Sequence, residues 1–391
     1  MHKIFVTAVG AISCAGSGAD EYWEGINAQA GIRPDELKLP VDIPQNIENR
    51  VARRMDRFSR LTMSASKQVL DEAVIEQEQL DHNRIGTVFT TGYGPLVSNL
   101  ALSNQILSGG VDMVSPTVFA STVYNSGIGH VCLSLKLKGA STVLTGSNAI
   151  AYASDLLKSG KADAILCGGV EEYCQELLDS FQQKDYATKD ENYLCRPLDQ
   201  NRSGTRMTEG AAALLLETQS VLARCPERIV CEVVGYASLI GKGYMGKDRA
   251  DADFKPFARV MDMALKHASI SPGDIDGVLL AAGGGRHSDK AEAQAIHEVF
   301  GQRAASIPVS SIKGATGETL GASFMMNVAA GALAIAKGCM PLTAGCTEPD
   351  AALELDIVHH EPRVGDYEYL LVNGYDVNGC LHSVILGAVR R

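Results

Sequence analysis

The chain has 391 residues, of which 46% are hydrophobic, and carries a formal charge of −11 at pH 7 with a pI near 5.3. This length and apolar content suffice for a large buried core, in one large domain or two closely packed ones. The negative charge argues against a nucleic-acid-binding protein, because no basic field is available to neutralise phosphates. No stretch approaches the roughly 20 apolar residues of a membrane span, so we expect no membrane association.

The N-terminal segment and the cysteines point to a cytoplasmic protein. Residues 1–18 lack a charged region followed by an uninterrupted apolar run, and we predict a β-strand there rather than a signal peptide. The ten cysteines show no C-x-x-C spacing, so we expect neither a disulfide framework nor a metal site. The glycine run at 283–285 lacks the third glycine of a dinucleotide-binding loop, and we expect no cofactor.

Apolar, β-branched runs alternate along the chain with segments of helical period. This alternation predicts an α/β protein with mostly parallel sheets. In chain order we predict strands at residues 3–9, 85–90, 164–167, 211–216, 276–280 and 381–386, and helices at residues 59–72, 149–159, 256–267, 291–300 and 322–336.

One segment of the chain occurs twice. Residues 3–13 align without gaps on residues 228–238, and both copies carry Ile, Val, Gly and Ser at matching positions. The two copies open parts of similar length, residues 1–225 and 226–391, which we predict to be an N-terminal and a C-terminal half. Eleven residues alone would be weak evidence for a repeat.

The most specific motif is the segment SIKGATGETLGA at residues 311–322. It resembles the K-x-x-x-G-H-x-x-G-A signature of β-ketoacyl-acyl-carrier-protein synthases, the ketosynthases. Further segments resemble the same family at residues 22–23, 30–32, 115–130, 167–171, 196–211 and 289–295. The resemblance covers nearly the whole chain. It implies a thiolase-like fold, in which duplicated βαβαβ halves form a layered α-β-α-β-α structure, in agreement with the repeat.

The catalytic positions of the family are altered here. Family members condense acyl chains with a cysteine at a helix N-terminus and two histidines that assist decarboxylation and stabilise the enolate. The first histidine position corresponds to Ala281, and His287 lies six residues too late, which we attribute to an exposed loop. The second histidine position corresponds to Glu318. The family's glycine-rich G-F-G-G-x-N loop is replaced by residues 375–381.

The cysteine position has two possible alignments. Anchoring on the strand places Ser147 there and shortens the following helix by about one turn, whereas anchoring on the helix places Val143 there and shortens a central strand. We prefer Ser147, because a helix end loses a turn more readily than a core strand loses its middle. Neither residue supplies a thiol. Ser147 also fits a helix N-cap, which we favour over a nucleophile.

Glu318 cannot replace an imidazole directly, because an ionised carboxylate donates no hydrogen bond and repels an enolate. As a structural residue, Glu318 suits the first turn of a helix that begins near residue 319, where the helix dipole favours negative charge. The retained Lys313 is then its expected ion-pair partner.

The loss of the thiol, both imidazoles and the loop on a retained scaffold implies a non-catalytic subunit. The resemblance is to the chain length factor, or KSβ, of type II polyketide synthases. Such a subunit forms a heterodimer with an active ketosynthase and shapes the acyl tunnel, and we expect the acyl carrier protein to dock mainly on the partner. The resemblance does not decide which pathway the subunit serves, and aryl polyene and anthraquinone synthesis are two examples.

Two other functions remain. One is a thiolase-fold acyltransferase or hydrolase with Ser147 as nucleophile, although it lacks the usual imidazole base. The other is a silent homodimeric binding protein. For the chain length factor, the resemblance implies a tunnel gate on the helix after residue 94 and the segment near residue 120, with the candidates Leu96, Leu100, Ser103, Phe119 and Tyr124.

Overall fold

The computed structural model describes residues 3–29, 31–32, 37–39, 49–72, 80–146, 148–190, 194–241, 253–376 and 378–389. Every strand and helix predicted from the sequence is present. The strands are β1 (Ile4–Ser13), β2 (Gly16–Ser17), β3 (Ile85–Thr90), β4 (Ser141–Leu144), β5 (Ala164–Glu171), β6 (Gly210–Thr218), β7 (Cys231–Ile240), β8 (Gly277–Leu279), β9 (Pro308–Ser310), β10 (Cys339–Met340), β11 (Asp356–Ile357), β12 (Arg363–Val364), β13 (Tyr369–Tyr375) and β14 (Cys380–Gly387).

The helices differ more in length, and the longest ones lie in the layers around the strands. They are α1 (Ala19–Ile26), α2 (Asn49–Ala52), α3 (Arg57–Glu72), α4 (Leu96–Gly109), α5 (Pro116–Ala120), α6 (Ser126–Ser134), α7 (Ala149–Lys158), α8 (Gln175–Gln183), α9 (Val221–Arg224), α10 (Lys255–Ala268), α11 (Arg286–Phe300), α12 (Lys313–Thr316) and α13 (Ser323–Lys337).

The two halves have the same strand order. The first half runs β1-β6-β5-β3-β4, and the second runs β7-β14-β13-β8-β9, with β11 added beyond β9. A short antiparallel contact joins them, in which Phe5 pairs with Glu232 and Val6 with Cys231. Each of the five strands from β1 to β4 along the first path has a counterpart between β7 and β9 on the second, which confirms the duplicated thiolase-like fold. The boundary between residues 225 and 226 stays a prediction.

The sheet is mixed, so the prediction of mostly parallel sheets was wrong at its centre. In the centre of the sheet, neighbouring strands run antiparallel along the path β6-β1-β7-β14-β13. Neighbours pair in parallel at the two ends, along β5-β3-β4 and along β13-β8-β9. Strands covered by helices on both faces are apolar throughout in either arrangement. The sequence therefore carries little information on strand direction here.

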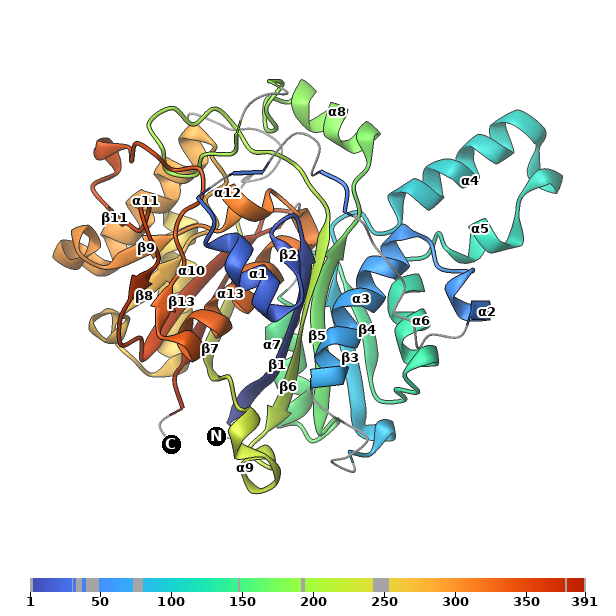
Figure 1. Cartoon of the computed structure of the whole chain (residues 1–391), viewed down its shortest axis with the longest axis horizontal. Helices are drawn as coiled ribbons and strands as arrows, with labels where there is room; N and C mark the ends of the chain where they lie inside the picture. The colour runs from blue at the N-terminus through green and yellow to red at the C-terminus, as the bar shows by residue number, and fades with distance from the viewer. Residues whose placement is uncertain are drawn as a thin grey trace.

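Helices separate and cover the two halves of the sheet. The buried helix α13 contacts β5, β6 and β1 of the first half and β13 and β14 of the second, and α7 also lies in this central layer. On the outer faces, α3 covers β1, β5 and β6, whereas α10 covers β7 and β14 and packs on α11 (Figure 1). This order gives the predicted α-β-α-β-α layers.

The central helix is longer and more apolar than we predicted for any segment of this chain. The stretch Leu320–Lys337 is long and apolar enough to cross a membrane by length and composition, with a mean hydropathy of 1.4. Since 89% of it is buried inside the protein, its apolar character is explained by contact with both halves of the sheet. The statement that no such stretch exists was therefore wrong, but the helix belongs to the core.

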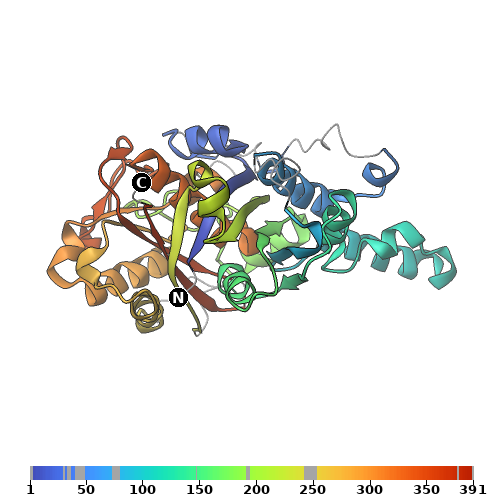
Figure 2. The ribbon, with the colours of Figure 1, turned by 90° about the horizontal axis from the view of Figure 1, so that it is seen from below.

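An arm made of α4 and α5 extends away from the layered body (Figures 1 and 2). The structure describes all of α4, and none of its residues is buried. Large apolar side chains are exposed on the arm, with Leu107 85%, Val111 73% and Met113 68% exposed. Such a surface on a single chain is typical of an interface with a partner.

Candidate functional site

Lys313 and Glu318 lie in the short segment between β9 and α13. Gly317 follows α12 with a φ of +68°, and a Cβ there would lie 2.5 Å from the Thr208 side chain, so this turn requires glycine. The turn directs Glu318 back toward Lys313, whose Nζ lies 2.6 Å from Oε2 of Glu318. The structure thus contains the ion pair predicted from the sequence.

The Glu318 carboxylate is buried and accepts hydrogen bonds at both oxygens. Its side chain is 0% exposed, and that of Lys313 is 3% exposed. Besides Lys313, Oε2 accepts from the hydroxyls of Tyr186 at 3.3 Å and Tyr375 at 3.4 Å. The other oxygen, Oε1, accepts from the backbone N–H of Leu320 at 2.9 Å and from the hydroxyl of Ser323. Glu318 is therefore an acceptor in a closed network rather than a free acid.

The two tyrosines complete this network. Their hydroxyl oxygens lie 3.1 Å apart, and burial raises the pKa of both phenols above their usual value. Burial opposes the charged form of Lys313 and is the largest single effect on its pKa, but the charge of Glu318, Tyr375 and the hydrogen bonds to both together raise the pKa of the ammonium. Lys313 Nζ also lies 4.1 Å from the ring centroid of Tyr375. Lys313 thus stays positively charged and fixed.

The loop that contains Ala281 packs against the same cluster. Ala281 is fully buried among apolar side chains, and its N–H donates to Glu292 at 3.0 Å. A Cβ on Gly283 would lie 3.5 Å from both the Lys313 side chain and the Tyr375 hydroxyl. The loop after Ala281 thus approaches the Lys313–Glu318 pair through Gly283, and the assignment of Ala281 and Glu318 to the family's histidine positions stays a prediction.

His287 is not the exposed loop residue expected from the sequence. Helix α11 begins at Arg286, five residues before the predicted start, so His287 lies in its first turn and is half-buried. The helix start is stabilised by the buried Asp289, whose carboxylate accepts from the backbone N–H of Gly283, Gly284 and Leu198. A buried acidic residue in the first turn is favoured by the helix dipole.

The turn between β4 and α7 is where we predicted the family's cysteine position. Ser147 is outside the described residues. The N-cap of α7 is Asn148, whose side chain accepts from the N–H of Ala151 at 3.1 Å, so the assignment of the cap to Ser147 was wrong. Val143 lies within β4, where it pairs with Phe89 of β3. It is therefore part of the sheet and not of the turn.

The gate candidates lie on or beside the arm. Leu96 and Leu100 are half-buried, whereas Ser103 is exposed and its hydroxyl donates to the Asn99 carbonyl at 2.9 Å. Phe119 is 61% exposed and Tyr124 is 47% exposed. In the single chain these side chains are therefore at least partly open to solvent and do not enclose a tunnel.

An aromatic path connects the base of α4 with the Glu318 cluster. The ring centroids of Tyr93 and Phe181 are 6.3 Å apart, and those of Phe181 and Tyr186 are 5.4 Å apart. Tyr93 is three residues before the first residue of α4, and Tyr186 bonds to Glu318. The path could not be predicted from the sequence, because Tyr93 and Tyr186 are 93 positions apart and come close only in the folded chain.

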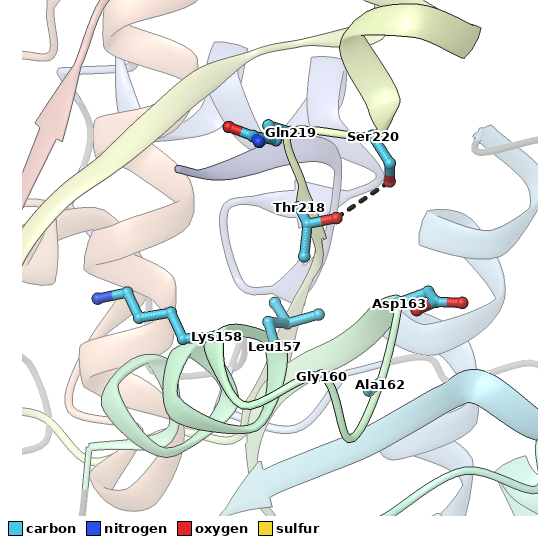
Figure 3. A pocket seen from close by; sticks show the side chains of 8 residues that line it. All are labelled: Leu157, Lys158, Gly160, Ala162, Asp163, Thr218, Gln219 and Ser220. Atoms are coloured by element: carbon cyan, nitrogen blue, oxygen red, sulfur yellow. Dashed lines mark hydrogen bonds between the residues drawn. The ribbon is translucent and has the colours of Figure 1, made fainter. Parts of the chain in front are cut away.

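A separate cavity of about 480 Å³ lies at the far end of β6 (Figure 3). It is lined by Leu157, Lys158, Gly160, Ala162, Asp163, Thr218, Gln219 and Ser220. The nine-residue strand β6 runs from next to the Glu318 segment to this cavity, a length of about 25–30 Å. The cavity is therefore not part of the candidate site.

Comparison with known proteins shows similarity to β-ketoacyl synthases over nearly the whole chain. Models of the beta-ketoacyl synthase N-terminal and C-terminal domains match residues 1–221 and 230–347. The chain is 29% identical to 3-oxoacyl-[acyl-carrier-protein] synthase 2 of Synechocystis sp., over 98% of this chain and 97% of that protein.

Solved structures agree as well. A beta-ketoacyl synthase from Burkholderia phymatum STM815 is 27% identical with a TM-score of 0.88, and each chain covers 100% of the other. The ishigamide ketosynthase/chain length factor has the same coverage at 23% identity and a TM-score of 0.86, a likeness of fold. From the matched domains and the shared architecture, the chain belongs to the β-ketoacyl synthase family.

Proposed function

We propose that this chain is a chain length factor, a non-condensing ketosynthase-like subunit that pairs with an active ketosynthase in type II polyketide synthesis. The observation that carries the proposal is the buried Lys313–Glu318 ion pair, which lies where we predicted the family's second histidine. Among the described residues, five groups donate hydrogen bonds to the Glu318 carboxylate. A fixed negative charge there would repel the enolate that condensation must stabilise.

The surface of the first half supports pairing with a partner. Strand β4 is the last strand of the sheet, so one of its edges is open, and exposed backbone edges of this kind invite a second strand. Large apolar side chains are also exposed on α5, on α6 and between them, where Leu133 is 70% exposed, Phe119 61% and Val123 49%. An interface over residues 115–146 would be apolar and bury on the order of 2,000 Å² or more.

The arm and the aromatic path give the proposed subunit a way to limit chain length. Leu96 and Leu100 are half-buried in the first turns of α4, whose first residue follows Tyr93 by three positions. A partner that covers the arm would enclose these side chains, and they would then form one wall of its acyl tunnel. Because this chain carries a net charge of −11, we expect the acidic acyl carrier protein to dock mainly on the partner.

Expression with and without an active ketosynthase of the same organism tests the proposal. We expect the two chains to purify as a 1:1 complex that condenses acyl and malonyl units, and this chain alone to form no β-ketoacyl product. The partner's cysteine should be acylated, and intact mass should show no adduct at Ser147. A stable, active homodimer, or a Ser147 adduct that Ser147→Ala removes, would contradict the proposal.

A further inference from the structure

A serine, a histidine and an aspartate are linked at the junction of β7, β13 and β14. Ser238 and His382 are cross-strand partners on β7 and β14, and the Ser238 Oγ–His382 Nδ1 distance is 3.1 Å. The other ring nitrogen, Nε2, lies 3.2 Å from Oδ2 of Asp376, which follows β13. Ser238 is 144 positions from His382 in the sequence, so no motif announces the group.

The surroundings fix the imidazole and the carboxylate. The side chain of His382 is 2% exposed and that of Asp376 is 8% exposed, and the His382 ring packs on Phe324 with centroids 5.1 Å apart. The second oxygen of Asp376 accepts from the N–H of Asn378 at 2.8 Å and of Cys380 at 3.1 Å. Ser238, in contrast, is exposed. The Ser238 hydroxyl is thus open to solvent, whereas the imidazole and the carboxylate behind it are buried.

The hydrogen bonds select one tautomer of the neutral imidazole. A carboxylate only accepts, so Nε2 carries the proton that is donated to Asp376. Nδ1 then has a free lone pair and accepts from the Ser238 hydroxyl. A serine bonded to a basic nitrogen whose ring is oriented by a carboxylate is the arrangement that activates a hydroxyl for nucleophilic attack.

The group also lies beside the turn where the family holds its acyl chain. The Asn148 side chain, at the start of α7, donates to the carbonyl of Ala237 at 3.5 Å, next to Ser238. A Cβ on Gly146 would lie 2.5 Å from the amide nitrogen of Asn378. Residues on both sides of the triad therefore touch the ends of the β4–α7 turn.

We propose that Ser238, His382 and Asp376 form an acyl-hydrolase site that cleaves acyl thioesters. Oγ of Ser238 attacks the thioester carbonyl and gives its proton to Nδ1 of His382. The C–S bond breaks, and the thiolate leaves as a thiol with that proton, so that an ester on Ser238 remains. Water then attacks this ester with His382 again as base, and a carboxylic acid and the free serine result. The choice of a thioester rests on the proposed function, whereas the serine chemistry does not.

A fluorophosphonate probe on the full-length chain, alone and in complex with its ketosynthase, tests the serine itself. We expect the probe to label Ser238, as mapped by peptide mass spectrometry, and Ser238→Ala to reduce total labelling at least about 100-fold. Asp376→Asn should reduce it to a similar degree, because the ring then loses its orienting carboxylate. Ser108→Ala is the matched control, since Ser108 is an exposed serine bonded only to helix carbonyls.

The outcomes separate this proposal from the previous one. If Ser238 is labelled no more than Ser108, or if the label is found at Ser147, the hydrolase site is overturned even when the heterodimer forms. If Asp376→Asn does not fold, the two serine variants still decide, because both positions are exposed. If the chain hydrolyses an acyl-N-acetylcysteamine thioester and Ser238→Ala abolishes this activity, acyl thioesters are the substrate class. This result would hold even if no heterodimer formed. Labelling without such hydrolysis would overturn the thioester assignment.

Discussion

At the scale of single residues, the Lys313–Glu318 pair is the feature with the clearest energetic consequence. Both side chains are removed from solvent, so each charge depends on the other for compensation. We expect Lys313→Met to lower the free energy of unfolding by about 3–5 kcal/mol, because it leaves a buried carboxylate without its cation. Urea unfolding measures this loss.

The double variant Lys313→Met/Glu318→Gln should recover most of that stability, because it removes both charges. Lys189→Met is the matched control, since Lys189 pairs with Asp185 on the surface, where the side chains are 63% and 73% exposed. Its effect should stay within about 0.5 kcal/mol. If Lys313→Met leaves the free energy of unfolding unchanged, the ion pair does not contribute the expected stability.

The sequence predicted this pair but not its neighbours. Lys313 and Glu318 are five positions apart within one motif, so their proximity follows from local spacing. Tyr186 is 132 positions from Glu318 and Tyr375 is 57 away, and they meet only through the tertiary fold. The same holds for Ser238 and His382. Contacts of this kind cannot be derived from periodicity or motifs.

At the scale of elements, α4 offers a test of chain-length control. If Leu96 and Leu100 form part of a tunnel wall, Leu96→Trp and Leu100→Trp should shorten the products of the reconstituted pair without abolishing condensation. The physical reason is that the larger indole fills space that the growing chain needs. Mass spectrometry of the released products, with the complex verified by gel filtration, gives the measurement.

Ala101→Trp serves as the control on the same helix, because Ala101 is exposed. It should leave product length unchanged. If both leucine variants give products of the original length with an intact complex, the gate lies on another element.

Element positions were predicted well where the pattern is local. Strand β3 was predicted with its observed ends, Ile85 and Thr90, because a β-branched run is bounded by polar residues. The start of α11 was missed by five residues, because its glycine-rich entry has no side-chain cap and Asp289 acts from inside the first turn. Strand direction could not be predicted from apolar composition.

At the scale of the whole molecule, buried acidic groups predict the response to pH. Burial is the main cause that raises the pKa of Glu171 and Glu292 to about 7, of Glu172 to about 8 and of Asp289 to about 6. Ordinary values are 4.5 for glutamate and 3.8 for aspartate, so at intermediate pH the folded chain binds more protons than the unfolded one. The stability from these groups is full below about pH 4 and is lost as pH rises through 6 to 8.

We therefore expect a lower free energy of unfolding at pH 8 than at pH 6. Glu172→Gln should reduce this difference and stabilise the protein at pH 8 by about 1–3 kcal/mol, since one carboxylate oxygen of the buried Glu172 has no hydrogen-bond partner among the described residues. Glu361→Gln, at an exposed position, should leave the pH dependence unchanged. Stability that rises from pH 6 to pH 8 would show that other groups dominate.

The antiparallel centre of the sheet has a consequence for synthesis on the ribosome. All ten residues of β1 are buried in the folded protein, and among the described strands its partners are β6, β7 and the two-residue β2. Since Ile4 pairs with Thr218, β1 leaves the ribosome more than two hundred residues before its main partner, β6, is complete. At about 5–20 residues per second this delay lasts roughly 10–40 s. Throughout that time β1 is an apolar segment without its main partner, and it is the part of the nascent chain that a chaperone would have to shield longest.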